Sequence, residues 1–131
     1  MTLTNVLNLT RAYMPISIIL LLLSGCAHLG IYWLSLQAVP DEGPAPLTVS
    51  FNAEITGGPD TSPELYCQEQ TWDLGDGRRV GVYGLCKAWR PGVKIDRHFQ
   101  LVHTYTKPGI YEVSVSIGPL ESEPMLVTVL E

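Results

Sequence analysis

From Leu47 onward, apolar and polar residues alternate with a period of two. The alternation is clear over residues 47–53 and 111–117, and a shorter segment follows at 127–129. A period of two places one set of side chains against a core and the other in water, which is typical of antiparallel strands. Turn-forming sequences punctuate the intervals, namely Gly57-Gly58-Pro59-Asp60, Asp76-Gly77, Pro108-Gly109 and Gly118-Pro119. No amphipathic helical pattern appears after Leu47, so residues 47–131 are predicted to form an all-β antiparallel β-sandwich.

A long apolar segment precedes this domain. Ile16 to Val39 contains no Asp, Glu, Lys or Arg. One interpretation is a transmembrane helix, because about 20 apolar residues cross a bilayer core, and Tyr32 and Trp33 would then lie toward the outer interface. The other is a lipoprotein signal, in which Leu23-Ser24-Gly25-Cys26 resembles a lipobox and Cys26 is the lipidated residue. A buried helix of a soluble domain is a third, weaker interpretation.

The charges that flank this segment predict its orientation. Arg11 precedes it, and Asp41 and Glu42 follow it. The positive-inside bias therefore places residues 1–15 in the cytoplasm and the domain in the periplasm or extracellular space, attached to the membrane. Residues 40–46 hold three prolines and are predicted to form an extended linker. The net charge of −5, with no basic tail, argues against a nucleic-acid partner.

Two motifs connect the alternating segments to a known family. Thr71 to Gly77 spells TWDLGDG, and His103 to Val115 spells HTYTKPGIYEVSV. They resemble the signature motifs of the polycystic kidney disease (PKD) domain family, WDFGDG and HxYxxPGxYxVxLxV. Pro46 to Ala53 resembles the first strand of that family and Leu126 to Leu130 its last. The resemblance covers Pro46 to Glu131 and implies an immunoglobulin-like β-sandwich.

The motif residues are interpreted as structural. Trp72 shares its parity with Leu74, so both are expected in the core, with Asp73 pointing the other way. Tyr105 is expected to anchor a loop through its hydroxyl group, and His103 to form a hydrogen bond beside it. The structural set comprises Trp72, Asp73, Gly75, Asp76, Gly77, His103, Tyr105, Pro108, Gly109 and Tyr111.

Other chemistry at these positions has less support. A calcium site would need about six oxygen ligands, and Asp73, Asp76 and Asp60 do not provide an obvious set. The aspartates are therefore assigned to turns, with no metal and no cofactor. No Cys-His-Asn or Ser-His-Asp arrangement is recognisable, which favours a protein that is not an enzyme.

Two cysteines lie in the predicted outer domain. Cys67 and Cys86 face an oxidising compartment if the orientation above holds, so they are predicted to form a disulfide. Two free thiols, or a metal-binding role together with His98, are the alternatives.

The chain departs from the family pattern at Arg78 to Val102, which is predicted to be an insertion. It contains six of the seven basic residues that follow the apolar segment, and the aromatic residues Tyr83, Trp89 and Phe99 lie among them. The candidate interaction residues are Arg79, Tyr83, Trp89, Arg90, Lys94 and Arg97. Either they form a contact surface, or the aromatic residues cap the sandwich while the cations balance nearby acids; anionic lipid or an acidic glycan would also suit the cations.

The function expected from these observations is that of a membrane-tethered domain that mediates protein–protein interaction, as an accessory or structural subunit of a membrane or envelope complex. The alternative is a cell-surface module that binds carbohydrate or a matrix protein. The predicted partners are thus the membrane, through the N-terminal segment, and a protein or a surface polysaccharide.

Overall fold

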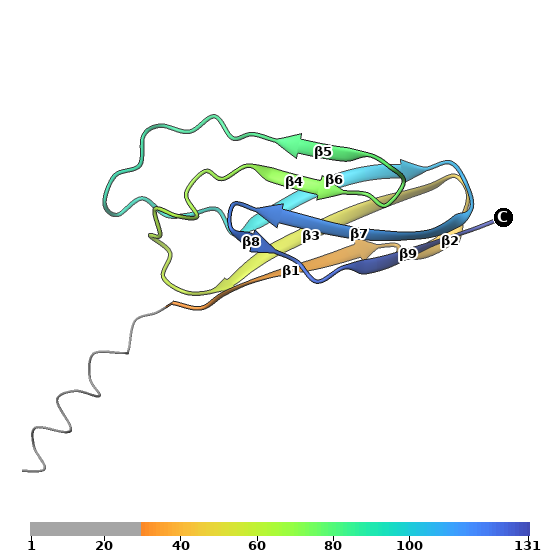
Figure 1. Ribbon diagram of the computed structural model, residues 1–131, viewed down its shortest axis with the longest axis horizontal. Helices are drawn as coiled ribbons and strands as arrows, with labels where there is room; N and C mark the ends of the chain where they lie inside the picture. Colours follow the sequence, from red (N-terminus) through yellow and green to blue (C-terminus); the bar gives the residue numbers. More distant parts are fainter. Residues whose placement is uncertain (1–29) are drawn as a thin grey trace, which may run out of the picture.

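A computed structural model describes residues 30–131, which consist of strands and irregular connections without a helix (Figure 1). In chain order the strands are β1 (Tyr32–Val39), β2 (Glu42–Pro44), β3 (Leu47–Gly57), β4 (Gln70–Asp73), β5 (Arg79–Val82), β6 (His98–Tyr105), β7 (Gly109–Ile117), β8 (Leu120–Glu121) and β9 (Met125–Leu130). The predicted all-β class is therefore confirmed.

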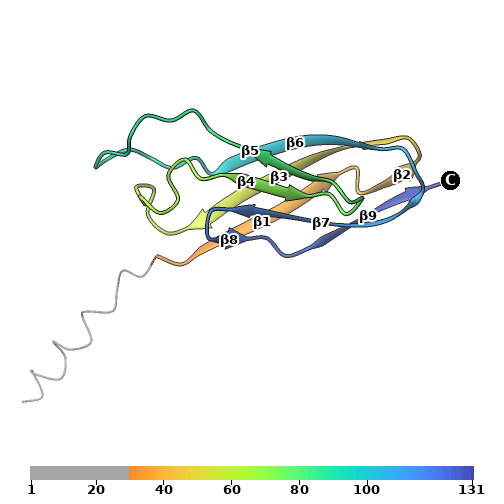
Figure 2. The same cartoon turned by 45° about the horizontal axis from the view of Figure 1, so that its top comes forward.

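The strands form two sheets packed face to face (Figures 1 and 2). The smaller sheet has the order β1-β3-β6, and the larger has the order β2-β9-β7-β4-β5, with β8 paired to β7. All paired strands are antiparallel except β2 and β9, which are parallel. The arrangement is a β-sandwich, as predicted.

The core lies between the two sheets. In β3 the buried residues alternate with residues that contact water, and Val49 and Phe51 are fully buried. Trp72 of β4 and Val113 of β7 cover them from the other sheet, and the ring centroids of Phe51 and Trp72 lie 6.4 Å apart. Period-two alternation thus places large apolar groups on the inner faces, where their burial stabilises the fold.

The prediction of a membrane segment that reaches Val39 is wrong at its C-terminal end. Residues Tyr32–Val39 form β1, which pairs with β3 along its whole length. Leu34 is buried in the core, while Ser35 and Gln37 face water, so this part has the pattern of a half-buried strand. In the described part of the chain, no helix has the length and apolar character needed to cross a bilayer. The predicted n-region, the apolar residues before position 30 and Cys26 lie outside the described residues.

The predicted linker is also part of the domain. Within residues 40–46, β2 pairs with β9, and Thr128 N–H donates to the carbonyl oxygen of Asp41 at 2.8 Å. Ala45 N–H donates to the carbonyl oxygen of Leu130 at 2.9 Å. Proline is tolerated here because β2 is an edge strand, where a missing N–H breaks no ladder. The chain thus leaves the smaller sheet after β1, pairs with the larger sheet in β2 and returns to the smaller sheet in β3.

The predicted insertion is shorter than Arg78 to Val102. Its first residues form β5, paired with β4, and its last residues begin β6, paired with β3. The irregular part is residues 83–97, which we call the β5–β6 loop.

Candidate functional site

The TWDLGDG motif forms the end of β4 and the turn to β5. Trp72 and Leu74 are fully buried, whereas Asp73 points outward. Asp73 Oδ1 accepts the N–H of Gly75 at 3.2 Å, and its Oδ2 lies 3.2 Å from Arg79 Nε. Gly75 has φ of 77°, and a Cβ there would lie 2.5 Å from the carbonyl oxygen of Glu112. The first aspartate and the first glycine therefore shape the backbone.

The second aspartate of the motif joins the turn to β6. Asp76 Oδ1 accepts the N–H of Arg78 at 3.1 Å, and Oδ2 lies 2.8 Å from His103 Nε2. Burial opposes ionisation of Asp76, but the hydrogen bonds with His103 and with the Arg78 amide, together with the charge of His103, outweigh it and lower the pKa of this carboxyl group below 3.8. Both carboxyl oxygens are thus already engaged in structural contacts.

Three aromatic rings support this turn. Tyr105 O–H donates to the carbonyl oxygen of Leu74 at 2.8 Å, and burial, followed by the negative charge of Asp76, raises the pKa of the Tyr105 hydroxyl group. The Tyr105 ring stacks on Tyr111 at 4.4 Å and meets the His103 ring edge-on at 4.7 Å. Tyr111 O–H donates to the carbonyl oxygen of Lys107 at 2.6 Å, which closes the turn that contains Pro108 and Gly109.

The lowered pKa of Asp76 predicts a pH dependence of stability. Because the pKa is lower in the folded state, ionised Asp76 stabilises the fold above its ordinary pKa, and this contribution disappears as the pH falls through the folded value. We expect Asp76→Asn to lower the free energy of unfolding by about 1 kcal/mol at neutral pH. Urea titrations of both proteins from pH 7 to pH 2 should show the difference shrinking below pH 3.8. A difference that stays constant over this range would contradict the assignment.

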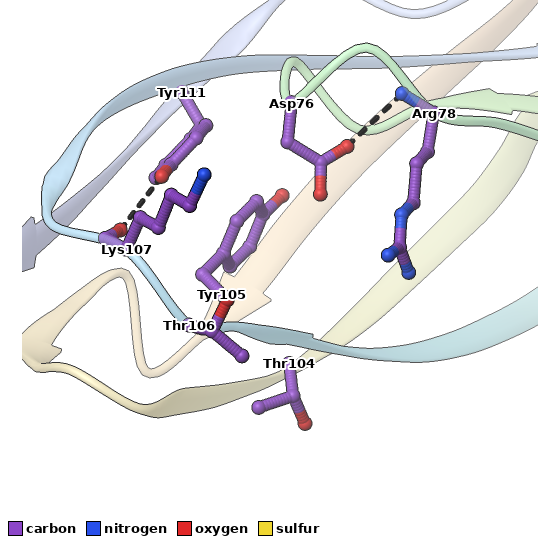
Figure 3. A pocket seen from close by; sticks show the side chains of 7 residues that line it. All are labelled: Asp76, Arg78, Thr104, Tyr105, Thr106, Lys107 and Tyr111. Carbon is purple, nitrogen blue, oxygen red and sulfur yellow. Dashed lines mark hydrogen bonds between the residues drawn. The ribbon is translucent and has the colours of Figure 1, made fainter.

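A cavity of about 210 Å³ opens beside the turn (Figure 3). Its lining includes the cationic side chains of Arg78 and Lys107, on either side of Tyr105, and the residues Thr104 and Thr106. The Thr104 hydroxyl group points away from Asp76 and lies 2.8 Å from that of Thr48. Neither cation forms an ion pair with a residue in the range 30–131. This site is therefore positive despite the presence of Asp76.

Within residues 30–131, no three His, Cys, Asp or Glu side chains gather closely enough to hold a metal ion. The three aspartates considered as calcium ligands do not converge. Asp60 contacts Arg97, which directly precedes β6, whereas Asp76 contacts His103 near the other end of that strand.

The predicted disulfide is confirmed. Cys67 and Cys86 are bonded, with their Cα atoms 6.1 Å apart. Tyr66 O–H adds a second connection, because it donates to the carbonyl oxygen of Lys87 at 2.8 Å. The start of the β5–β6 loop is thereby fixed to the segment that precedes β4.

Large apolar side chains of this loop remain in water. Tyr83 is 74% exposed and Leu85 is 106% exposed, and Trp89 is 37% exposed. A hydrogen bond with Glu69 raises the pKa of the Tyr83 hydroxyl group, so this aromatic residue has a neighbour in the segment before β4. Trp89 precedes the turn in which Val93 N–H donates to the carbonyl oxygen of Arg90 at 3.1 Å. Leu85 was not among the predicted interaction residues, because an aliphatic side chain in the local sequence gives no sign of exposure.

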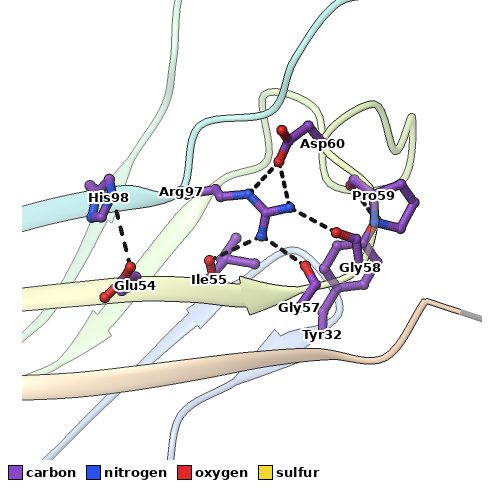
Figure 4. Close-up of polar contacts among 9 residues, drawn as sticks. All are labelled: Tyr32, Glu54, Ile55, Gly57, Gly58, Pro59, Asp60, Arg97 and His98. Carbon is purple, nitrogen blue, oxygen red and sulfur yellow. Dashed lines mark hydrogen bonds and ion pairs between the residues drawn. The ribbon is translucent and has the colours of Figure 1, made fainter.

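The cations predicted as interaction residues, together with Lys87, separate into two groups. Arg97 is a structural residue: it contacts Asp60 at 2.7 Å and donates to the carbonyl oxygens of Ile55, Gly57 and Gly58 at 2.8–3.1 Å (Figure 4). Arg79 lies in β5 and pairs with Asp73. The remaining loop cations, Lys87, Arg90 and Lys94, are exposed and form no ion pair with any described residue.

The two candidate sites lie at opposite ends of the sandwich. The β5–β6 loop is at the end where the chain enters the domain at residue 30, and the β6–β7 turn beside the cavity is at the other end (Figures 1 and 2). A contact between Tyr32 O–H and the carbonyl oxygen of Pro59, 2.7 Å long, holds the entering strand next to the loop after β3 (Figure 4).

No family model matches the sequence, and no curated protein matches it. Among solved structures, the chain is similar to the PKD domain of an M14-like peptidase from Thermoplasmatales archaeon SCGC AB-540-F20, with 17% identity and a TM-score of 0.48, over 76% of this chain and 94% of that one. Its two sheets make the described part of the chain a β-sandwich, and the motifs whose contacts are given above resemble those of PKD domains.

Proposed function

We propose that the protein is a membrane-tethered, non-enzymatic PKD-like domain that mediates protein–protein interaction as an accessory subunit of a membrane or envelope complex. The observation that carries the proposal is the position of the β5–β6 loop, at the end where the chain enters from residue 30. If the apolar residues before position 30 are the tether, this loop lies next to the membrane. A partner embedded in the same membrane is then within reach, whereas a ligand on another surface would first meet the opposite end.

The chemistry of the loop supports a protein partner. Aromatic and arginine side chains contribute most often to interface energy, and the loop presents Tyr83, Trp89 and Arg90 together with the fully exposed Leu85. The disulfide of Cys86 lowers the conformational entropy that ordering the loop on binding would cost. The exposed cations of the loop form no ion pair with residues 30–131, which favours a partner with an acidic surface.

The motif carboxylates support a non-enzymatic role. A general acid needs a raised pKa, whereas the pKa of Asp76 is lowered. Asp73 is occupied by the Gly75 amide and the Arg79 side chain. Both aspartates of the motif therefore form contacts that stabilise the turn.

The proposal predicts a loss of partner binding when the exposed loop side chains are removed. We expect Tyr83→Ser/Leu85→Ser/Trp89→Ser to reduce co-purified membrane partners by roughly tenfold or more, because it removes the interface anchors and leaves the disulfide intact. The measurement is an affinity purification of the full chain in mild detergent, quantified by mass spectrometry.

The matched control is Val102→Ser/Ile110→Ser. These residues are 64% and 69% exposed but lie on β6 and β7, outside the loop. The control should recover partners as the unmodified chain does. If the loop variant recovered as many partners as the unmodified chain, the loop would not be the contact surface. Sedimentation of the same variant with membranes would show separately that the tether is intact.

A further inference from the structure

One side of β6 has backbone groups that no strand uses. Ile55 N–H donates to the carbonyl oxygen of Arg97 at 2.8 Å, and the register of β3 with β6 continues from this pair without interruption. Because hydrogen-bonded and non-bonded pairs alternate in an antiparallel ladder, the odd-numbered residues of β6 bond to β3. The even-numbered residues direct their N–H and C=O groups away from β3, namely His98, Gln100, Val102 and Thr104. Among residues 30–131, no strand pairs with these groups, which we call the free edge of β6.

The other three edges of the sandwich are protected, each in a different way. β2 has three residues and contains Pro44, and β5 has four residues and an exposed arginine, Arg79. β1 contacts β7, β8 and β9 of the larger sheet, which close the sandwich on that side. β6 has eight residues, and its sequence HFQLVHTY contains no proline, lysine, arginine or acidic residue. An exposed edge of this length and composition is a template onto which a further strand adds.

The larger sheet extends beyond β6 on this side. Tyr105, at the end of β6, donates to the carbonyl oxygen of Leu74, directly after β4, so β6 lies over β4. β5 is the next strand of the larger sheet, whereas no strand of the smaller sheet follows β6. The inward side chains Val80 and Val82 of β5 are only partly buried, as is Phe99 of β6. An apolar strip opposite β5 is thus left for one more strand.

The β5–β6 loop does not fill this space. β5 and β6 lie along the same border of the molecule, and the loop that joins them extends from the end of the sandwich instead of along the strands (Figures 1 and 2). The free edge of β6 therefore faces solvent for most of its length.

The charges around the free edge define the strand that fits it. Arg78 and Thr104 line the same cavity, so Arg78 lies near the end of β6 that is far from residue 30 (Figure 3). Arg78 is exposed and forms no ion pair within the described residues. An unpaired cation attracts an acidic group placed beside it. The complementary strand is uncharged along β6 and acidic at one end.

We propose that the free edge of β6 binds an extended segment of a partner protein as an added antiparallel strand. Alternate residues of the segment exchange N–H and C=O bonds with the even-numbered residues of β6, while the residues between them cover Val80 and Val82. All strand pairs of the domain except β2 with β9 are antiparallel, and this direction places the N-terminal end of the segment next to Arg78. A second copy of the whole domain fits less well, because β5 of each copy projects into the space beneath the added strand. The inference rests on the proposed function only in requiring a protein partner, since the free edge is separate from the β5–β6 loop.

The probe for this site is the capped peptide Glu-Thr-Val-Thr-Val-Thr-Val-Thr. It is labelled with a fluorophore and titrated with full-length protein in detergent micelles, with fluorescence anisotropy as the signal. Residues directly opposite each other in a sheet share a face. The threonines therefore lie on the outer face and carry the N–H groups that point to β6, and the valines fill the strip over β5.

N-methylated peptides test the backbone hydrogen bonds directly. Methylation of three threonine nitrogens should weaken binding by roughly tenfold or more, because it removes donors and places methyl groups between the strands. Methylation of the three valine nitrogens leaves those donors intact and should change binding little. The two peptides have the same composition, so both enter the micelles to the same extent.

Val102→Pro is the matching change in the protein. The N–H of Val102 belongs to the free edge, so proline there breaks no bond to β3 but blocks the added strand. We expect peptide binding to weaken by roughly tenfold or more, with an unchanged midpoint of urea unfolding.

Gly81→Pro is the control for Val102→Pro, because it changes the edge of β5 instead. Leu74 N–H donates to the carbonyl oxygen of Arg78, so by the same alternation the N–H of Gly81 points away from β4. This variant should bind the peptide as the unmodified protein does. The loop variant Tyr83→Ser/Leu85→Ser/Trp89→Ser should also bind it unchanged, which separates this inference from the proposed contact of the β5–β6 loop.

Arg78→Gln tests the acidic end of the segment. It should weaken binding of the peptide several-fold and have no effect on a peptide in which glutamine replaces the glutamate.

Three results would overturn the proposal. The first is no binding of the peptide by the unmodified protein, whether because nothing adds to the edge or because a second copy occupies it. The second is equal binding of the two methylated peptides. The third is an equal loss of binding in Gly81→Pro and Val102→Pro. The comparison of methylated peptides uses the unmodified protein, so it decides the question even if Val102→Pro does not fold.

Discussion

Replacement of Trp72 by alanine should lower the free energy of unfolding by about 3–5 kcal/mol, the range found for large aromatic residues removed from cores. The indole is fully buried in β4 and faces Phe51 across the sandwich. Its Nε1–H donates to Gln70 Oε1 at 3.3 Å, so truncation leaves both a cavity and a broken polar contact. Because small domains have a stability of about 5–15 kcal/mol, this single change removes a large part of it.

Trp33→Ala is the matched control for this experiment. Trp33 is 61% exposed on β1, so its removal takes little apolar area out of the core. Urea unfolding monitored by far-ultraviolet circular dichroism reports both variants without depending on tryptophan fluorescence. If Trp33→Ala lowered the free energy of unfolding as much as Trp72→Ala, burial of the Trp72 side chain would not be the source of the stabilisation.

The strands that could be predicted best were those with one face in the core and the other exposed to solvent. In β3 and β7, Ser, Thr and Glu alternate with branched or aromatic side chains, and the alternation continues for most of each strand. Such a pattern determines both the strand and the face that enters the core, because a shift by one residue would bury the polar set. The turns between the strands were visible for a similar local reason, since Gly and Pro mark positions of restricted or unusual φ.

β1 and β2 could not be predicted in the same way. Hydropathy does not distinguish a strand that continues an apolar segment from the end of a membrane span, although Ser35 and Gln37 alternate with Leu34 and Leu36. β2 contains Pro44, which normally opposes strand assignment, and it is stable only because β9 lies beside it. In both cases the deciding contact comes from a strand far along the chain.

In the candidate sites, too, contacts between residues close in sequence could be predicted, whereas contacts between distant segments could not. Asp73 and Asp76 each accept a hydrogen bond from the backbone amide two residues further along the chain. Their role in the turn could therefore be predicted from the local sequence. Arg97 was indistinguishable from the other cations of the segment because its carbonyl acceptors lie far along the chain, at the end of β3 and at the start of the loop that follows it. The free edge of β6 follows from the order of the strands in the two sheets, so no single segment of sequence reveals it.

The second large effect is expected from loss of the disulfide. Cys67 and Cys86 are 19 residues apart, and in the chain-entropy model a cross-link over a loop of this size contributes about 3 kcal/mol by restricting the unfolded chain. We expect Cys67→Ser/Cys86→Ser to lower the free energy of unfolding by that amount, measured by urea unfolding with tryptophan fluorescence as the signal.

Cys26→Ser is the control, because it removes the third cysteine without touching the disulfide and should leave the unfolding midpoint unchanged. A reducing agent should destabilise the unmodified protein to the level of the double variant and have no effect on that variant. The same loss of restraint should weaken partner binding by the β5–β6 loop, because the freed loop must then be ordered on contact. A double variant that unfolds at the same urea concentration as the unmodified protein would show that the local hydrogen bonds, such as that of Tyr66 to Lys87, are sufficient to fix the loop.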